Sequence, residues 1–258
     1  MSGPNPLVVF LSILRARRLR APDPAGTGRY EHGDLAPVLA AVADRGVAGL
    51  SGRAGELAAI VDRRAAVDPD TLGRDEALAF WLNLYNAGAL DAARRAFETG
   101  ETSVLGVPGA FDEAFVEVAG ESLTLDGIEH GKIRRFGDPR IHGALVCGSV
   151  SCPTLRREPY EAARLDAQLD AQLRSFLAHG GADDDRELGV LRLSRVFLWY
   201  GADFTRPRRM PTLLPTTKRR LRDALTPWLP APMRGWVGAV APKVEYLPYD
   251  WGLGCSVR

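Results

Sequence analysis

The sequence has little cysteine, little histidine and almost no excess of charge. Its 258 residues include three cysteines and four histidines, and 33 basic against 32 acidic side chains leave a net charge of +1. Three cysteines are too few for a disulfide-stapled scaffold, so a reducing compartment, the cytoplasm, is expected. The near-neutral charge argues against nucleic acid as a partner, because proteins that bind it usually carry a strong basic excess.

Long apolar runs are also missing. The apolar run Leu7 to Leu14 spans eight residues, whereas a helix that crosses a bilayer needs about 20. Basic residues follow this run and none precedes it, which is the wrong order for a secretory signal. Its apolar side chains recur at helical spacing and predict a short helix docked on the body, with peripheral membrane contact through residues 7–20 as the alternative. These side chains are Leu7, Phe10, Leu11 and Leu14.

What remains is an ordinary globular composition, 46% hydrophobic and 25% charged. We expect an N-terminal helix and linker over residues 1–29 and a single domain over residues 30–258. The proline-rich segment 205–258 has room for one helix, near Thr216 to Leu229, and its aromatic end favours folding back on the body.

The clearest helix is predicted from Asp75 to Phe97. Between Ala77 and Leu90 it is apolar nearly all round, which is typical of a helix in the middle of a domain. Asn83 and Asn86 interrupt this stretch on one face, so both amides need partners in the interior. They either tie down a neighbouring loop or orient a catalytic group or substrate.

Shorter elements follow along the chain. Asp126 and Glu129, three residues apart, fit an N-cap and its reciprocal acid at the start of a helix. Apolar patterns predict three strands and one helix. These elements are strands at Glu121–Leu125, Arg140–Gly148 and Val190–Tyr200 and a helix at Tyr160–Leu177. For Arg140–Gly148 a helix remains the alternative.

Histidine and cysteine are concentrated in one region. His130, His142, Cys147 and Cys152 fall within 23 positions, whereas His32 and His179 are expected on the surface. The four residues suit a thiol nucleophile with an imidazole base oriented by Glu129, Asn83 or Asn86. They also suit a zinc site, although the spacing matches no common pattern, a thiol–disulfide pair, or small buried residues at a tight junction.

Two cysteines compete for the role of nucleophile. Cys152 precedes Pro153, so it could cap a short helix whose dipole lowers the thiol pKa. Cys147 ends an apolar run just before Gly148, where a thiol can emerge with close backbone access. In a straight strand His142 and Cys147 lie on opposite faces, which favours His130 as base, and a break in the strand would favour His142.

Six segments together resemble the domain of unknown function 547 family. They run in order over about residues 30–253: FWLNLYNA (80–87), LTLDGIEHGKIR (123–134), RIHGALVCGSVSCPTL (140–155), EPYEAARLDAQL (158–169), SRVFLWYGADF (194–204) and YLPYDWGLG (246–254). The resemblance implies one α+β domain whose closing segment belongs to the core. We expect this domain to be helix-rich, with a small antiparallel sheet and a papain- or transglutaminase-like core. Its marked positions here are Asn83, Asn86, Glu129, His130, His142, Cys147, Cys152, Trp199, Tyr200, Asp203 and Phe204. Gly252 and Gly254 stand where the family has Ser and Asn, and some relatives lack the second cysteine, which favours Cys147.

These observations lead to one main hypothesis. The protein is expected to be a cysteine-dependent hydrolase or acyl transferase, in which Cys147 attacks an amide or ester of a small-molecule or peptide substrate. His130 or His142 serves as base with Glu129, no cofactor or metal is expected, and further residues shape the binding site: Asn83, Asn86, Cys152, Trp199, Tyr200 and Asp203. The alternatives are a non-catalytic module with a groove floored by Trp81, Trp199 and Tyr200, or a His/Cys metal site.

Overall fold

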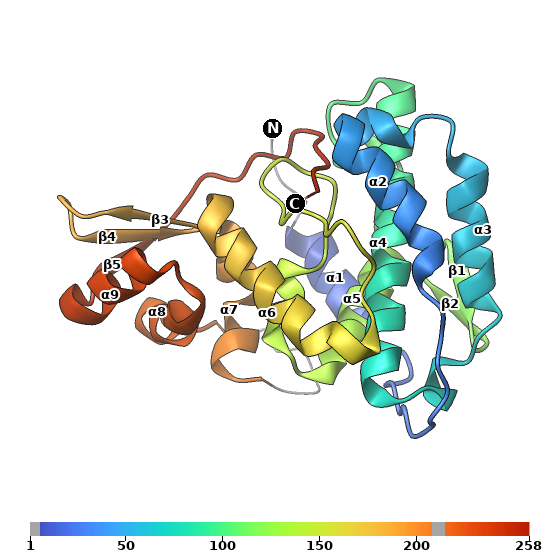
Figure 1. Cartoon of the computed structure of the whole chain (residues 1–258), viewed down its shortest axis with the longest axis horizontal. Helices are drawn as coiled ribbons and strands as arrows, with labels where there is room; N and C mark the ends of the chain where they lie inside the picture. Colours follow the sequence, from blue (N-terminus) through green and yellow to red (C-terminus); the bar gives the residue numbers. More distant parts are fainter. Residues whose placement is uncertain (1–5, 208–214, 258) are drawn as a thin grey trace.

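One long helix, α4 (Arg74–Thr99), runs through the larger part of the molecule in the computed structural model, which describes residues 6–207 and 215–257 (Figure 1). Acidic Asp75 and Glu76 lie in its first turn, where the helix dipole favours negative charge. Gly100, with φ 75°, ends the helix in the left-handed conformation. Seventeen of its side chains are buried, so the prediction of a central, surrounded helix is confirmed.

The other helices and strands are short. Helices α2, α3 and α5 surround α4, while α6 leads from this body to an extension that contains α7, α8, α9 and the larger sheet (Figure 1). The helices are α1 (Pro6–Ala16), α2 (Ala36–Arg45), α3 (Ala54–Ala65), α5 (Leu125–Gly131), α6 (Leu165–Phe176), α7 (Arg195–Thr205), α8 (Lys218–Leu225) and α9 (Ala231–Val240). The strands are β1 (Val116–Val118), β2 (Glu121–Leu123), β3 (Ala182–Asp185), β4 (Val190–Leu193) and β5 (Lys243–Tyr246).

The strands form two small sheets. Strands β1 and β2 pair antiparallel, with Glu117 opposite Ser122. In the second sheet, of order β3-β4-β5, β3 pairs antiparallel with β4 whereas β5 runs parallel to it. The helix-rich α+β prediction is therefore confirmed, although the larger sheet is mixed. A papain- or transglutaminase-like core is not confirmed by this arrangement.

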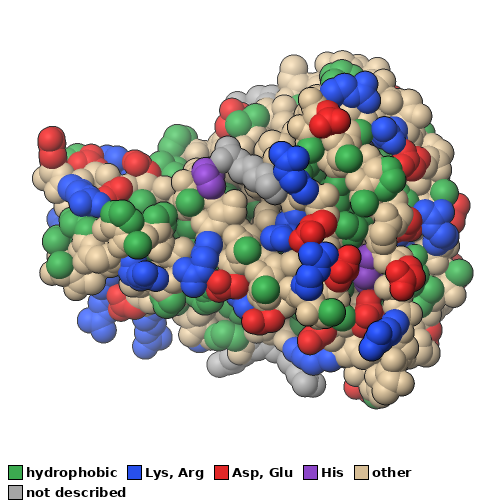
Figure 2. All heavy atoms as spheres, viewed as in Figure 1, with side chains coloured by type: hydrophobic (Ala, Val, Ile, Leu, Met, Phe, Trp, Pro, Cys, Tyr) green, Lys and Arg blue, Asp and Glu red, His purple; other side chains and the backbone are tan. Residues whose placement is uncertain are grey.

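Buried apolar side chains gather in two regions. Two clusters lie on either side of α4, and a third fills the extension between α6, α7, α8, α9 and the mixed sheet. Outside these clusters, basic and acidic side chains are interspersed over the face drawn in Figure 2. The body and the extension thus each have a core, and α5, α6 and α7 lie where they join.

Helix α1 forms as expected, but a different face of it docks. Ser12, Ile13 and Ala16 are buried toward α5, whereas Phe10, Leu11 and Leu14 are exposed. A Cβ on Gly131 would lie 2.7 Å from Leu19 Cδ1 and 3.0 Å from the Ala16 oxygen, so glycine on α5 permits the close approach. The Leu7 side chain lies outside the described residues, and membrane contact stays a prediction. No described helix has both the length and the apolar character needed to cross a membrane.

Three local predictions were wrong at positions where a different side chain caps a helical segment. The predicted strand Arg140–Gly148 is a 3-10 turn, Pro139–Gly143, capped by the Asp138 side chain, followed by irregular chain. The strand predicted over Val190–Tyr200 ends at Leu193, because Ser194 Oγ accepts from the Val196 N–H and starts α7. Thr124, not Asp126, caps α5, and its Oγ1 accepts from the Gly127 N–H.

In its described part, residues 215–257, the C-terminal segment contains two α-helices, α8 and α9, rather than one. Beyond β5 the chain returns to the body, where the Val150 N–H donates to the Gly252 oxygen at 2.8 Å. Leu253 pairs with Ser149, and Val257 pairs with Leu155. Through these contacts the tail lies along residues 149–155, next to both cysteines of the predicted site.

Candidate functional site

A chain of buried polar side chains joins α5 to α7. Arg134, just beyond α5, donates from Nε and Nη2 to the two oxygens of Asp203 at 2.8 and 3.0 Å. Asp203 Oδ2 also accepts from His142 Nε2 at 2.9 Å, and Arg134 Nη1 lies 3.2 Å from His130 Nδ1. The structure thus brings together three predicted residues, His130, His142 and Asp203, through an arginine that the sequence analysis did not single out.

The partners of the two histidines fix their tautomers. A guanidinium group only donates, so His130 Nδ1 accepts from Arg134, while His142 Nε2 carries the hydrogen that it donates to Asp203. Burial lowers the pKa of both imidazoles. Burial alone would raise the pKa of Asp203, but hydrogen bonds from His142 and Arg134 hold it well below its usual range. Both histidines are therefore neutral near pH 7 beside an ionised Asp203.

Tyr200 of α7 covers this network. Its ring stacks on that of His142, with centroids 4.1 Å apart and an interplanar angle of 18°. The Arg134 guanidinium lies over the same ring at 5.2 Å. The ring thereby holds the His142 imidazole and the Arg134 side chain in fixed orientations.

Glu129 is the acid beside this network whose pKa is raised most. Burial raises its pKa to about 7, against the lowering effect of the Arg134 charge and of a hydrogen bond from Tyr200. Tyr85 of α4 is a further hydrogen-bond partner. Glu129 Oε1 has no hydrogen-bond partner in the described parts of the chain and lies 3.5 Å from His130 Nδ1. A carboxyl group that gains or loses a proton near neutral pH suits general acid–base chemistry.

The two sequence-predicted cysteines form a disulfide. Their Cα atoms are 6.3 Å apart, and the Cys147 N–H points to Cys152 Sγ at 3.1 Å. Ser149 Oγ lies 3.2 Å from Cys147 Sγ. The Tyr249 hydroxyl lies 3.5 Å from Cys147 Sγ, 3.4 Å from Cys152 Sγ and 2.8 Å from Ser149 Oγ. We call these four residues, Cys147, Ser149, Cys152 and Tyr249, the sulfur cluster.

The sulfur cluster and the histidine network are separate groups of contacts. In the described residues no hydrogen bond joins Cys147 to His130 or His142, so a cysteine–histidine pair stays a prediction. The charge of Glu129 acts on the sulfur cluster through its contribution to the pKa of Tyr249. Burial raises the pKa of Tyr249 to about 12, with Ser149 lowering it and the charge of Glu129 raising it further. Glu129 is therefore the ionisable predicted residue whose charge acts on the sulfur cluster.

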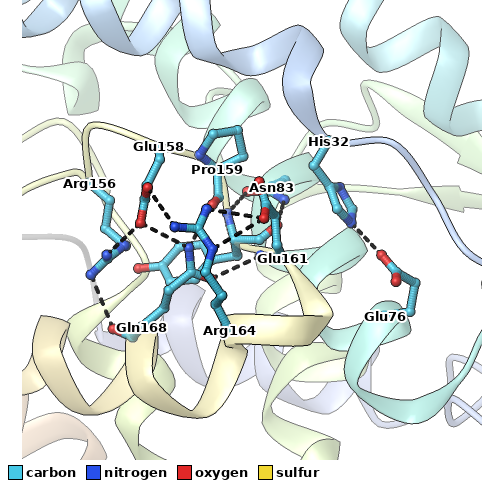
Figure 3. A network of polar contacts seen from close by, with 10 residues as sticks. His32, Glu76, Asn83, Arg156, Glu158, Pro159, Glu161, Arg164 and Gln168 are labelled. Carbon is cyan, nitrogen blue, oxygen red and sulfur yellow. Dashed lines mark hydrogen bonds and ion pairs between the residues drawn. The ribbon is translucent and has the colours of Figure 1, made fainter.

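Both buried asparagines bind backbone and so tie down loops. Asn86 donates to the Ala144 oxygen at 3.1 Å and accepts from the Val146 N–H at 3.2 Å. Asn83 makes the same pair of bonds with Tyr160, at 2.8 and 3.0 Å. Asn83 lies beside a surface network of charged and amide side chains (Figure 3). Asn86 acts directly on the site, because it holds the chain immediately before Cys147.

Aromatic side chains of α7 and the tail lie next to the sulfur cluster. Trp199 is 43% exposed, and its ring centroid lies 4.9 Å from that of Tyr249 and 5.5 Å from that of Trp251. Trp81 is buried in the core, where Lys132 lies 5.6 Å over its ring. The expected groove floored by Trp81 together with Trp199 and Tyr200 was therefore wrong, because α4 directs Trp81 into the interior.

Two further expectations concern histidine and metal. His32 was expected on the surface, but it is buried, and its Nε2 lies 2.9 Å from Glu76 Oε1 (Figure 3). Burial lowers its pKa to about 4. Within residues 6–207 and 215–257, no group of three or more His, Cys, Asp or Glu side chains is arranged to hold a metal ion.

The sequence analysis missed Arg134, Tyr85, Ser149 and Tyr249. Three of them carried a usable signal. Ser149 lies in the segment 140–155 that the family resemblance had marked. Arg134 lies four residues after His130, the spacing at which helical side chains meet. Tyr249 belongs to the aromatic tail segment that the family resemblance had marked. Tyr85 had none, because it is one of many apolar positions on a helix buried all round.

Comparison with protein families places the central part of the site in a known group. Residues 69–177 match the family described as "Protein of unknown function, DUF547". This region contains Glu129, both network histidines, Arg134 and the paired cysteines, whereas Asp203 and Tyr249 lie beyond it. Neither the curated proteins nor the solved structures include a match. The match supports the resemblance of residues 69–177 to the DUF547 family, whose function is unknown.

Proposed function

We propose that this protein, in its reduced form, is a cysteine-dependent hydrolase or acyl transferase that acts through Cys147 on an amide or ester. One observation carries the proposal. The half-buried Cys147 sulfur contacts the Tyr249 hydroxyl, and the charge of the nearby Glu129, whose pKa is raised to about 7, acts on that hydroxyl. A thiol nucleophile, hydroxyl donors and a carboxyl titrating near neutral pH are components of thiol catalysis.

In the proposed reaction the Cys147 thiol loses its proton and the thiolate attacks the carbonyl carbon of the substrate. The hydroxyls of Ser149 and Tyr249 donate hydrogen bonds to the thiolate, and Glu129 accepts and returns the proton. The carbonyl–heteroatom bond breaks, the leaving alcohol or amine takes a proton, and a thioester forms on Cys147. Attack by water or by an acceptor then releases the acyl group and restores the thiol.

The histidines take a different role from the one expected from sequence. Each makes a hydrogen bond within the Arg134–Asp203 network, and burial lowers the pKa of both. In this proposal they are positioning residues, which hold Arg134 and Tyr200 around the Glu129 carboxyl. This arrangement sets the pKa of Glu129, on which the proton transfer depends.

The test measures acylation of the reduced protein by p-nitrophenyl acetate, with the modified cysteine identified by peptide mass spectrometry. We expect acetylation of Cys147, its loss in Cys147→Ala, and a rate that rises with pH around 7 and loses that inflection in Glu129→Gln. Cys255 is a built-in control, because it is buried and burial raises its thiol pKa to about 12. Cys255→Ala should leave the rate unchanged. Acetylation of Cys147 no faster than that of Cys255 would contradict the proposal.

A binding module is the second candidate, and the exposed Trp199 beside Tyr249 and Trp251 favours it. Large exposed aromatic surfaces are common at binding sites. Under this candidate, Trp199→Ala abolishes binding of a ligand from a peptide library while Cys147→Ala binds as tightly as the unmodified chain. Loss of binding in Cys147→Ala would instead favour thiol chemistry.

A further inference from the structure

We propose that Cys147 and Cys152 form a reversible dithiol–disulfide centre that oxidises the paired thiols of a cysteine-containing polypeptide. This activity uses atoms of the sulfur cluster but does not depend on acyl transfer. Its substrate is defined by chemistry: a thiolate that attacks a disulfide, with a second thiol nearby to complete the exchange.

The chain between the two cysteines is held in place from both sides. Before it, Asn86 binds Ala144 and Val146. Along it, the tail binds the loop: the Gly254 N–H donates to the Gly148 oxygen at 3.0 Å, and the Ser151 N–H donates to the Asp250 oxygen at 3.2 Å. These bonds do not involve the sulfurs, so the cysteines stay close together when the disulfide is reduced.

The turn itself requires glycine. Gly148 has φ +79°, a left-handed conformation, and a Cβ there would lie 2.7 Å from Val104 Cγ2. The turn brings the two Cα atoms to 6.3 Å, within the range that disulfides span. The loop geometry therefore allows the sulfurs to bond without moving the backbone.

The contacts distinguish the roles of the two sulfurs. Cys152 Sγ receives a fixed backbone donor, the Cys147 N–H at 3.1 Å, together with the Tyr249 hydroxyl at 3.4 Å. Hydrogen bonds to a thiolate stabilise it and lower the pKa of the thiol, which makes it a better leaving group. Cys152 also packs against the core cluster around α4. Cys147 Sγ also has two hydroxyl neighbours, Ser149 Oγ at 3.2 Å and Tyr249 at 3.5 Å, but it has neither a backbone donor nor that packing. The backbone donor and the core packing therefore assign Cys147 as the sulfur that is attacked and Cys152 as the sulfur that leaves.

The exchange balances as two displacements. A substrate thiolate attacks Cys147 Sγ, a mixed disulfide forms, the Cys147–Cys152 bond breaks, and the electron pair remains on Cys152 Sγ. The second substrate thiolate attacks the substrate sulfur of the mixed disulfide and releases Cys147 as a thiolate. The substrate is oxidised to a disulfide, the cysteine pair is reduced, and the released thiolates take protons from solvent.

The aromatic side chains favour a polypeptide over a small thiol. Trp199, 43% exposed, packs on Tyr249, whose hydroxyl contacts both sulfurs. A peptide that places an apolar side chain on Trp199 can thus reach Cys147 with a neighbouring thiol. Glutathione supplies the same thiolate chemistry without that contact. Comparing the rates at which a peptide and glutathione reduce the disulfide therefore distinguishes a polypeptide substrate from a small thiol.

The experiment equilibrates the full-length chain with reduced and oxidised glutathione, quenches with acid, alkylates free thiols and locates them by mass spectrometry. We expect Cys147 and Cys152 to lose alkylation together as an internal disulfide while Cys255 remains a thiol. Cys152→Ser should accumulate a glutathione mixed disulfide on Cys147. Cys147→Ser should form one on Cys152 about tenfold more slowly, because the Cys152 side chain packs against the core cluster around α4.

Two further measurements complete the test. Tyr249→Phe should slow reduction of the internal disulfide about tenfold, the effect of losing one hydrogen bond to a developing thiolate. A synthetic peptide with two cysteines and a tryptophan should reduce the wild-type disulfide faster than glutathione at equal thiol concentration, and Trp199→Ala should remove that advantage. Equal rates for peptide and glutathione would overturn the polypeptide substrate.

Independent alkylation of Cys147 and Cys152 at every glutathione ratio would overturn the redox centre itself. Acylation is measured separately on fully reduced wild-type protein. An internal disulfide without acylation would therefore contradict the proposed function alone, and acylation without an internal disulfide would contradict this inference alone.

Discussion

The buried carboxyl of Glu129 gives a quantitative prediction about stability and pH. Burial raises its pKa from an ordinary value of 4.5 to about 7, and the residue is only 7% exposed. Between these two pKa values the folded protein keeps a proton that the unfolded chain has lost. Folding stability therefore falls as the pH rises from about 4.5 to about 7. Each pKa unit corresponds to about 1.4 kcal/mol, so the loss amounts to about 3 kcal/mol.

Glu129→Gln removes this titration while keeping the size of the side chain. The free energy of unfolding of the variant, relative to that of the wild type, should therefore increase by about 3 kcal/mol between pH 4.5 and pH 8. The measurement is urea unfolding of both proteins at closely spaced pH values, because other groups titrate equally in the two chains and cancel. Glu117→Gln, at an exposed position of β1, provides the matched control.

The sign of the effect is the sharpest part of this test. A difference in stability that stays constant with pH would show that Glu129 titrates normally. A difference that shrinks with rising pH would show that the folded protein stabilises the carboxylate. Either result would refute the assignment of Glu129 as the proton acceptor in the proposed function.

Other predictions concern the residues that hold the site together. Asp203→Ala leaves the buried Arg134 without its carboxylate and should lower the free energy of unfolding by about 3–5 kcal/mol, measured in urea at pH 7. A loss under about 1 kcal/mol would contradict a buried ion pair. The pKa of Asp203 lies well below its usual range, so the ionised carboxylate stabilises the folded protein above the unfolded pKa of about 3.9. This stabilisation is lost as the pH falls further, so the free energies of unfolding of wild type and Asp203→Asn should converge in acid. Asn86→Ala removes two buried hydrogen bonds ahead of Cys147 and should cost about 2–4 kcal/mol, with faster hydrogen exchange in that segment. Thr124→Ala removes the cap of α5 and should cost about 1 kcal/mol in thermal unfolding, which Thr124→Ser should restore.

Several features of this protein could be predicted from the sequence because their causes are local. The acidic start and the unbroken apolar stretch of α4 predict a central helix, and Asn83 and Asn86 on it had to find partners in the interior. The six ordered segments indicated the family, and the family match covers residues 69–177. The α+β class followed from the resemblance to that family.

Local patterns failed where a capping side chain or a tertiary contact decided the outcome. Ser194 and Asp138 turned predicted strands into helical structure, because one side-chain acceptor that satisfies a free N–H can outweigh a short apolar run. The docked face of α1 depended on Gly131 of α5, more than a hundred positions away, so the periodicity of the helix alone did not reveal which face is buried.

The order of residues along the chain sets which side chains are available for chemistry, whereas folding sets which of them meet. Histidine and cysteine are close in sequence, yet the structure binds the histidines to Arg134 and Asp203 and the cysteines to each other and to Tyr249. Asp203 and Tyr249 arrive from α7 and the tail, which lie next to α5 and residues 147–152 only after folding. The raised pKa of Glu129 likewise has a tertiary cause, because it comes from removing a carboxyl group from water.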